Sequence, residues 1–420
     1  MSGYVCASSE FLEKCSILGH SPESSRTDDG CFVDTTIPTL GVYRTFLGSN
    51  SVQRRKRVAQ FFNPGIKIRQ RLGQGLHDRG EASVFAEYEL NAEDKAALDV
   101  HLPLHVRTVS VAHKRVGAGA IWDVSVCGEA WGLDDMEELY VTLNIGLLEL
   151  EPGARLVVRG NVFAMICQRL IVHEPAADWQ IGILPTPHSV DFGHGPVNGA
   201  RGRPGANGVD GSPGRALRVE ETFIGPRALE PIRPELLDGG KGGDGEQGGR
   251  GASGRNGGMC KLADIVIRDL SGRLALFAQA GRGGNGGDGG FGGVGGNGGD
   301  GVPGPRLVSH QVRDGLAGSG GHGGDGGDGG AAGSGGIGSN IYLTVPPEAV
   351  SRVTCLSFES EPGESGCGGA GGCAGRSGAG PGAQPAAAGN NGQDGPRGRA
   401  RPAPWIFVNE IPKAGTGAGH

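Results

Sequence analysis

The chain has 420 residues, of which 84 are glycine and only 5% are aromatic, so long stretches lack the side chains that a conventional globular core would bury. Glycine is nearly three times as frequent as its average of about 7%. The 39 Lys and Arg residues almost balance the 45 Asp and Glu residues, giving a net charge of −6, which argues against a protein that binds nucleic acid or an anionic membrane mainly through charge.

The N-terminal region, residues 1–80, is polar and weakly patterned. Its first ten residues contain no basic stretch followed by an apolar run, so we expect no cleaved secretion signal. Residues 51–57 form a basic run, Ser-Val-Gln-Arg-Arg-Lys-Arg, of the kind that contacts phosphate or directs localisation. Because the whole chain is acidic, we interpret this run as a solvated turn or the start of a helix.

Residues 81–192 are expected to form a β-rich domain with at most one or two short helices. Residues 84–90 alternate apolar and polar side chains as a half-buried strand does, and Asn91 is a suitable N-cap for a helix over 92–98. Five short apolar runs follow at 139–143, 147–150, 155–158, 162–166 and 169–172. Such closely spaced strands predict a mainly β fold with a β-solenoid or a sandwich as its core. The longest apolar run, 162–167, is far below the ~20 residues of a spanning helix, so we expect no membrane insertion.

Between residues 193 and 411, glycine recurs at every third position in blocks that alternate with short apolar segments. The blocks run over 199–214, 239–257, 283–304, 315–336, and 363–378 with its continuation at 389–398. A period of three indicates the polyglycine-II geometry, a left-handed helix with three residues per turn and no internal hydrogen bonds. Its amides must therefore bond laterally to neighbouring helices. We predict a bundle of polyglycine-II helices beside the β core.

Many triplets carry a second glycine, so only every third residue has a side chain and neighbouring backbones can approach on two sides. The blocks with two glycines per triplet are predicted to lie deepest in the bundle; they are 239–258, 283–301 and 318–338. The single-glycine stretches 199–211 and 389–398 are predicted at its periphery. The apolar segments between blocks are expected to be strands that return to the β core, and residues 412–420 form a tail.

Three other interpretations of the glycine blocks remain open. A collagen triple helix also needs glycine at every third position, although the interior blocks have almost no proline. A calcium-binding β-roll is built on a nonapeptide that residues 295–303 match once. A flexible linker would explain the composition but not the register. The sustained register and the returning apolar segments favour the packed bundle.

The nine cysteines form no Cys-x-x-Cys pair and no repeated spacing. An odd number without a framework favours reduced thiols in a reducing compartment. Cys367 and Cys373 lie six residues apart in a glycine block, and whether they pair stays open. We expect no metal ion and no other cofactor. Synthesis in the cytosol is expected, and delivery to a surface or a virion is left open.

The Gly-Gly-x runs, such as residues 283–300, resemble the polyglycine-II bundles of the tail-tip adhesins of T-even-like phages and of snow-flea antifreeze protein. Glycine excursions from a β core also resemble the N-terminal domain of Obg-type GTPases, although the chain has no Gly-x-x-x-x-Gly-Lys-Ser/Thr phosphate loop. The resemblance covers residues 193–398 and nothing in 1–190. It implies the local structure of a glycine-helix bundle more than a particular function.

Polar and apolar side chains recur along one expected face of the glycine helices. The polar ones are Asn285, Asp288, Asn297, Asp300, Asp325 and Asp328. Such a ladder confers solubility, or it hydrogen-bonds a sugar polymer or a patterned surface. Phe291 and Val294 in the same column, and Ile337 in the next block, predict contact with the β core or with a partner. We predict these nine side chains as binding residues.

We expect a non-enzymatic structural or binding protein, adhesin-like, that presents a rigid glycine-rich slab and loop tips at 215–238 and 305–314. Its expected partner is a surface polysaccharide or a protein receptor. The alternative is self-assembly into a shell or filament. Ice binding by a flat face is a further alternative, which the Asp-rich columns disfavour. An enzyme with its site in 81–190 is the last, although its carboxylates match no known catalytic motif; they are Asp123, Glu129, Asp134 and Asp135.

Overall fold

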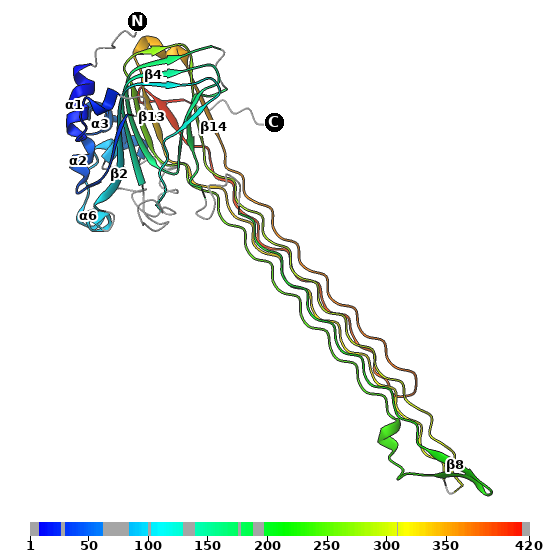
Figure 1. The fold of residues 1–420 in the computed structure, drawn as a ribbon. Coiled ribbons are helices and arrows are strands. Elements are labelled where there is room, and N and C mark those ends of the chain that lie inside the picture. Colours follow the sequence, from blue (N-terminus) through cyan, green and yellow to red (C-terminus); the bar gives the residue numbers. More distant parts are fainter. Residues whose placement is uncertain are drawn as a thin grey trace.

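The computed structural model describes residues 8–26, 30–61, 84–99, 102–128, 139–174, 178–187, 197–308 and 310–413. A head contains the helices and both large sheets, and a long bundle of glycine-rich segments projects from it (Figure 1). The far end of the bundle carries a small tip, formed by residues 215–238 and 302–314.

Short helices cover one side of the head. They include α1 (Ser9–Ile17), α2 (Leu40–Arg44), α3 (Ser51–Phe61), α6 (Ala92–Asp99) and the short 3-10 helix η1 (Ser24–Arg26). Ser8 and Thr39 precede the first two α-helices, and each hydroxyl accepts an amide N–H three residues on, from Phe11 at 3.1 Å and from Val42 at 3.3 Å. These caps explain why helices begin in a region with little apolar periodicity.

The larger sheet of the head has nine strands and is mostly parallel. Its order is β1–β2–β4–β6–β10–β13–β15–β16, with β11 also paired to β6. Only the outer pairs, β1 with β2 and β15 with β16, are antiparallel. The strands are β1 (Cys31–Ile37), β2 (Leu104–Val116), β4 (Leu139–Leu150), β6 (Val162–Val172), β10 (Ala263–Ile267), β11 (Leu270–Ser271), β13 (Ile341–Thr344), β15 (Ile406–Val408) and β16 (Ile411–Lys413).

A second sheet has five parallel strands in the order β14–β12–β7–β5–β3. They are β14 (Val353–Phe358), β12 (Leu274–Gln279), β7 (Ile181–Leu184), β5 (Arg155–Arg159) and β3 (Ile121–Asp123), with the 3-10 helix η5 (Pro347–Arg352) preceding β14. Apolar side chains of both sheets share one buried cluster. From β4 to β15 the chain passes back and forth between the two sheets, and this alternation determines where the glycine segments leave the head.

The expectation of a mainly β fold with a β-solenoid or sandwich core is wrong. The head is a mixed α/β structure with a large, mostly parallel sheet, and helices cover the outer face of that sheet (Figure 1). Tyr43 of α2, for example, packs edge-to-face on Tyr140 of β4, with ring centroids 5.1 Å apart. The apolar residues of region 1–80 are too few and too scattered to show a helical period, so the pattern alone did not predict these helices.

Two strands are longer than predicted, and the strands predicted over 84–90 and 306–312 are absent. The runs 139–143 and 147–150 are parts of β4, and 162–166 and 169–172 are parts of β6. Asn144 breaks the apolar run in β4, but its buried Nδ2 donates to the carbonyl oxygen of Phe11 at 3.0 Å. This partner, which lies on α1, satisfies the amide donor of a side chain that otherwise marks a break. Val84 to Ala86, expected in a strand, are helical.

A buried polar network joins the N-terminal helices to the large sheet. His20 lies with Nδ1 2.6 Å from the hydroxyl of Ser110 and with Nε2 3.0 Å from the hydroxyl of Thr108. The amide of Asn144 donates to the same Ser110 hydroxyl at 3.3 Å. Burial lowers the pKa of His20 below its ordinary value of 6.5, because a buried imidazolium loses its hydration.

Stability is therefore expected to fall in mild acid. Between the ordinary and the lowered pKa of His20, the unfolded state binds the proton more readily than the folded state, so the free energy of unfolding decreases as the pH falls below about 6.5. Urea unfolding at about pH 7.5 and pH 5.5 measures this decrease, which should be smaller in His20→Gln than in the parent protein. An equal pH dependence in both proteins would contradict this role of His20.

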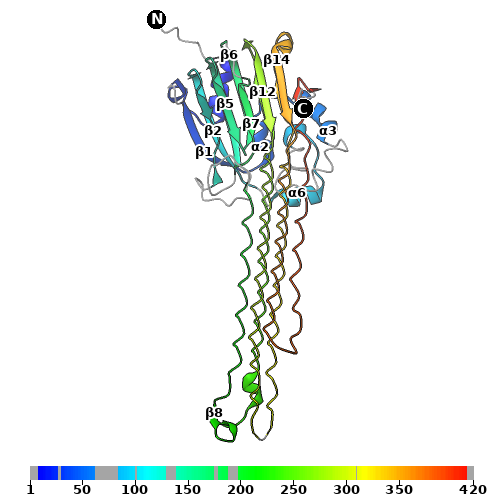
Figure 2. The ribbon, with the colours of Figure 1, turned by 90° about the vertical axis from the view of Figure 1, so that its right-hand side faces the viewer.

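The bundle consists of three out-and-back excursions, each of which begins after a strand of the five-stranded sheet and returns to a strand of the nine-stranded sheet. We name its segments I (197–214), II (239–258), III (281–301), IV (315–336), V (361–379) and VI (387–399). They run side by side along the bundle, and the third excursion turns back before reaching the tip (Figure 2). Segments I, III and V follow β7, β12 and β14, whereas II, IV and VI lead into β10, β13 and β15.

Lateral backbone hydrogen bonds hold the segments together. Amide donors recur at every third residue, at donor–acceptor distances of 2.7–3.0 Å. Within one row, Gly202 donates to Asp288 of segment III and Gly289 donates to Cys367 of segment V. The second row contains II, IV and VI, and further bonds join the rows. The bundle is thus two rows thick, with I, III and V on one face and II, IV and VI on the other.

The predicted depth of the glycine blocks is confirmed for segments I, III, IV and VI. Segment II, predicted among the deepest, lies at an edge of its row and bonds to three segments, I, III and IV, as V bonds to III, IV and VI. Segments III and IV are central, because III is bonded to I, II, IV and V, and IV is bonded to II, III, V and VI. The outermost segments bond less widely, I to II and III, and VI to IV and V. Close approach requires glycine on both inner faces, since a Cβ at Gly290 would lie 2.0 Å from the carbonyl oxygen of Arg203.

Candidate functional site

The predicted polar ladder completes the hydrogen bonding of the bundle. In segment III, four side chains each accept, through Oδ1, an amide N–H of segment V at 2.6–3.0 Å; they are Asn285, Asp288, Asn297 and Asp300. In segment IV, Asp325 and Asp328 accept the amides of Asn390 and Gln393 of segment VI at 2.6 and 2.8 Å. Each of these six side chains thereby satisfies an amide that no backbone carbonyl reaches. Ligand binding by this ladder stays a prediction.

The three predicted apolar residues lie in two different places. Phe291 and Val294 belong to the same outward column of segment III and are 52% and 43% exposed. The guanidinium of Arg201, on segment I, lies over the Phe291 ring at 4.9 Å from its centroid. Ile337 lies apart from them, half-buried where segment IV meets the head, and its carbonyl oxygen accepts the amide of Cys260 at 2.9 Å.

The loops expected to form tips do come together at the far end of the bundle. Residues 215–238 contain an antiparallel hairpin, β8 (Val219–Thr222) and β9 (Gly225–Ala228), and the 3-10 helix η4 (Pro234–Leu237). The loop over 302–314 packs beside them, and Val308 donates its amide to the carbonyl oxygen of Pro226 at 3.3 Å. A small apolar cluster centred on the buried Leu237 anchors both loops.

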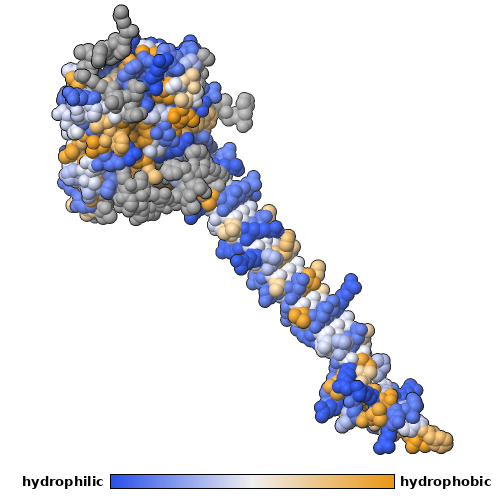
Figure 3. All heavy atoms as spheres, viewed as in Figure 1, coloured by the Kyte–Doolittle hydropathy of each residue, from blue (hydrophilic) through white to orange (hydrophobic). Residues whose placement is uncertain are grey.

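The apex of the β8–β9 hairpin exposes two large apolar side chains. Phe223 is fully exposed and Ile224 is 76% exposed, and they are the two residues between the strands. Two-residue hairpin loops are usually Asn-Gly, Asp-Gly or another polar or glycine pair. Neither the turn geometry nor the core of the tip therefore explains an aromatic and a β-branched residue here. Apolar side chains gather at this end of the molecule in the space-filling view (Figure 3).

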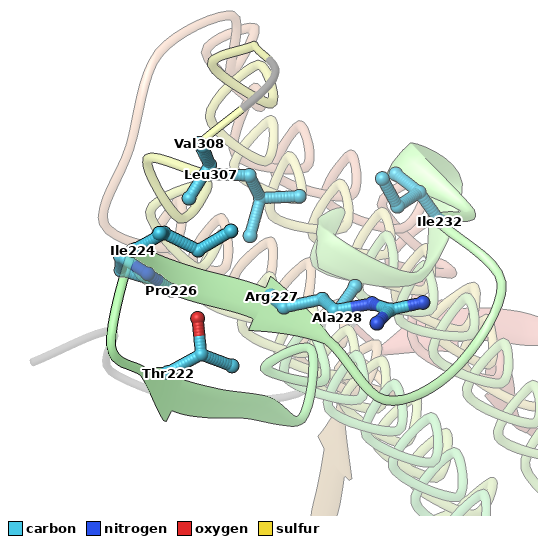
Figure 4. Close-up of a pocket in the computed structure, with 8 residues that line it drawn as sticks. All are labelled: Thr222, Ile224, Pro226, Arg227, Ala228, Ile232, Leu307 and Val308. Carbon is cyan, nitrogen blue, oxygen red and sulfur yellow. The ribbon is translucent and has the colours of Figure 1, made fainter.

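An apolar pocket of about 390 Å³ opens beside this apex. It is lined by Thr222, Ile224, Pro226, Arg227, Ala228, Ile232, Leu307 and Val308. Leu307 and Val308 come from the 302–314 loop and face the β9 strand across the pocket (Figure 4). The site therefore depends on both loops, which are brought together only at the end of the bundle.

An ion pair fixes the base of the tip. Arg313 donates to both carboxylate oxygens of Asp238 at 2.7 and 2.8 Å, and the amide of Leu316 donates to Oδ1 at 2.7 Å. These hydrogen bonds lower the pKa of Asp238 to about 2, and the bond from Arg313 has the largest effect. The pair links the end of η4 to the start of segment IV, so the hairpin is held against the bundle.

The other sequence candidates that the structure describes form no reactive cluster. Among the described residues no group of three or more His, Cys, Asp or Glu side chains could hold a metal ion, and Cys367 and Cys373 are free and exposed. Asp123 pairs with Arg159 at 3.1 Å. Three further carboxylates, Glu129, Asp134 and Asp135, lie outside the described residues, as does Cys6.

The basic run 51–57 is a helix start as expected, but it is not wholly solvated. Arg57 of α3 is buried against Asp264 of β10 and Glu410, which follows β15. This cluster stabilises the head. A single sequence has no signal for it, because Arg57 is more than 200 positions from either carboxylate in the chain.

Comparison with known proteins identifies no relative. No protein-family model, no curated protein and no solved structure matches the chain. In the part of the chain that the structure describes, no helix is both long enough and apolar enough to cross a membrane. The function must therefore be argued from the geometry of the tip and the bundle.

Proposed function

We propose that the protein is a non-enzymatic, adhesin-like binding protein that recognises a protein receptor through its distal tip. The observation that carries this proposal is the apolar apex of the β8–β9 hairpin, where Phe223 and Ile224 project into solvent beside an apolar pocket. Contiguous exposed apolar surface marks interaction sites, and an exposed aromatic residue is the usual anchor of a protein interface.

The bundle supports this role because it holds the tip away from the head. At about 3.1 Å per residue, segment III alone spans roughly 60 Å. Hydrogen bonds at every triplet and glycine on both inner faces keep the segments in register. A tip on such a support loses little conformational freedom on binding, which favours affinity.

A protein groove suits the apex better than a polysaccharide does. Phe223 and Ile224 have no hydrogen-bonding side-chain groups, and Oδ1 of the ladder Asp and Asn side chains already accepts an amide within the bundle. A sugar polymer would need many directed polar contacts, whereas an apolar groove gains its energy from burying these two side chains.

Substituting the apex is expected to abolish binding without disturbing the fold. Labelled protein is applied to a panel of cells and isolated surface polysaccharides, with and without EDTA. On a surface that binds the parent protein, the double variant Phe223→Ser/Ile224→Ser should bind at least about tenfold more weakly, since full burial of each side chain contributes about 1.5–3 kcal/mol.

The matched control is Val209→Ser, which replaces another exposed apolar residue, 80% exposed on segment I. It should bind like the parent protein. Absence of saturable binding to every surface, or equal binding by the apex variant, would disprove the proposal. Binding to a purified polysaccharide, or loss of binding in EDTA, would assign recognition to the bundle or to calcium instead.

A further inference from the structure

One exposed column of segment V is complementary to itself when reversed. Its outward side chains, three residues apart, are Glu364, Cys367, Ala370, Cys373 and Arg376. When the column is reversed about Ala370, Glu364 takes the position of Arg376, and Cys367 takes the position of Cys373. Among the described residues neither Glu364 nor Arg376 has an ion-pair partner within the chain.

We propose that two copies of this chain associate antiparallel through the face formed by segments I, III and V, with a twofold axis at Ala370. This arrangement places Glu364 of each copy opposite Arg376 of the other, and Cys367 opposite Cys373. A parallel arrangement would instead oppose like charges at both positions, which disfavours association. The charge order of the column therefore selects both the partner and its direction.

The centre of this face is apolar because the polar ladder is interrupted there. Asp288 and Asn297 accept the amides of Cys367 and Arg376 at 2.9 and 3.0 Å. Between them, Phe291 and Val294 occupy the equivalent positions and offer no acceptor. Each copy thus forgoes two capping hydrogen bonds and exposes an aromatic and a β-branched side chain. Burial of these side chains against a second copy would offset that loss.

The head leaves this face accessible. Segments I, III and V continue from β7, β12 and β14, so their face is on the side of the five-stranded sheet. The N-terminal helices cover the other sheet, on the side of the head away from β14 (Figure 1). These helices therefore do not overhang the proposed contact.

Cross-linking between variants that keep either Cys367 or Cys373, beside the buried cysteines, tests the direction of the contact. In a background with Cys6, Cys31 and Cys127 changed to Ser, one variant adds Cys373→Ser and the other adds Cys367→Ser. The probe is dibromobimane, which joins two neighbouring thiols by displacing two bromides. Like thiols of an antiparallel pair are about 19 Å apart, six residues at about 3.1 Å each. Each variant alone should therefore stay uncross-linked, and an equimolar mixture should yield a cross-linked dimer.

Sedimentation of the full chain tests the charge pairing. Arg376→Glu should raise the dimer dissociation constant about tenfold, because it replaces two attractive pairs with two repulsive ones. The double variant Glu364→Arg/Arg376→Glu should restore it. Arg250→Glu, on the opposite face of the bundle, is the matched control and should have no effect.

Three results would overturn the proposal: a monomer at every concentration, cross-linking of either cysteine variant with itself, or no recovery in the charge-swapped variant. The inference does not rest on tip binding. The variant Phe223→Ser/Ile224→Ser should dimerise like the parent protein. Loss of dimerisation and loss of receptor binding can therefore be measured independently.

Discussion

Replacing Arg57 with methionine is expected to lower the free energy of unfolding by about 3–5 kcal/mol. Arg57 is fully buried, and its guanidinium lies 3.2 Å from Asp264, 2.9 Å from Glu410 and over the ring of Tyr342 at 4.0 Å. Burial alone would lower the pKa of Arg57, but Asp264 and Glu410 together raise it, and a guanidinium stays protonated in proteins. Its loss would leave the buried Asp264 carboxylate without a cation.

Urea unfolding of the full chain measures this change. The matched control is Arg55→Met on the same helix, since the Arg55 side chain is 66% exposed and its closest carboxylate contact is 4.0 Å away. The control should shift stability by no more than about 0.5 kcal/mol. The double variant Arg57→Met/Asp264→Asn should recover part of the loss, because it removes the orphaned charge as well. Equal destabilisation by Arg57→Met and Arg55→Met would contradict the assignment.

Replacing Gly290 with alanine is expected to disrupt the centre of the bundle while the head stays folded. The added Cβ would lie 2.0 Å from the carbonyl oxygen of Arg203 and 2.5 Å from its carbonyl carbon. Neither backbone atom can move aside without breaking the bond from Gly249 to that oxygen, which is 2.7 Å long. The cost should reach about 3 kcal/mol, the upper end for overpacking.

Trypsin susceptibility measures the bundle separately from the head. Arg201 and Arg250 provide cleavage sites in segments I and II, whereas Trp122, Trp179 and Trp405 report on the head through their fluorescence. Gly290→Ala should be cleaved at these arginines much faster than the parent protein, with unchanged tryptophan emission. Asn297→Ala, which removes one exposed cap in the same segment, should remain nearly as resistant. Resistance of Gly290→Ala to trypsin would mean that the bundle tolerates a Cβ at its centre.

The head and the bundle are stabilised by different interactions. The head is stabilised by an ordinary apolar core and by a buried ion cluster, and it anchors both ends of each excursion. The bundle has almost no side-chain core and is stabilised by repeated backbone hydrogen bonds. Side chains for recognition can therefore lie on its outer columns, which form the proposed dimer contact. The tip lies at the end of the bundle.

The candidate site was only partly visible in the sequence. The loops at 215–238 and 305–314 were expected as tips because they connect glycine blocks, and they do lie together. Phe223 and Ile224 were not predicted as binding residues, because in a sequence pattern an apolar pair between two short strands is indistinguishable from part of one strand. The Asp and Asn columns were expected to face a ligand, and their hydrogen bonds to segments V and VI appear only when the neighbouring segment is known.

The sequence by itself determined the local geometry of the bundle and the depth of every predicted block except segment II. A three-residue period of glycine leaves one side-chain face per helix, and steric exclusion at the other two faces decides which blocks can lie inside. Only the tertiary structure decided which segments are neighbours. One glycine segment can pack equally well on any other, so their order is set by the order of the strands in the head. It also decided the α/β character of the head, since Arg57, Asp264 and Glu410 meet only when α3 packs on the completed sheet.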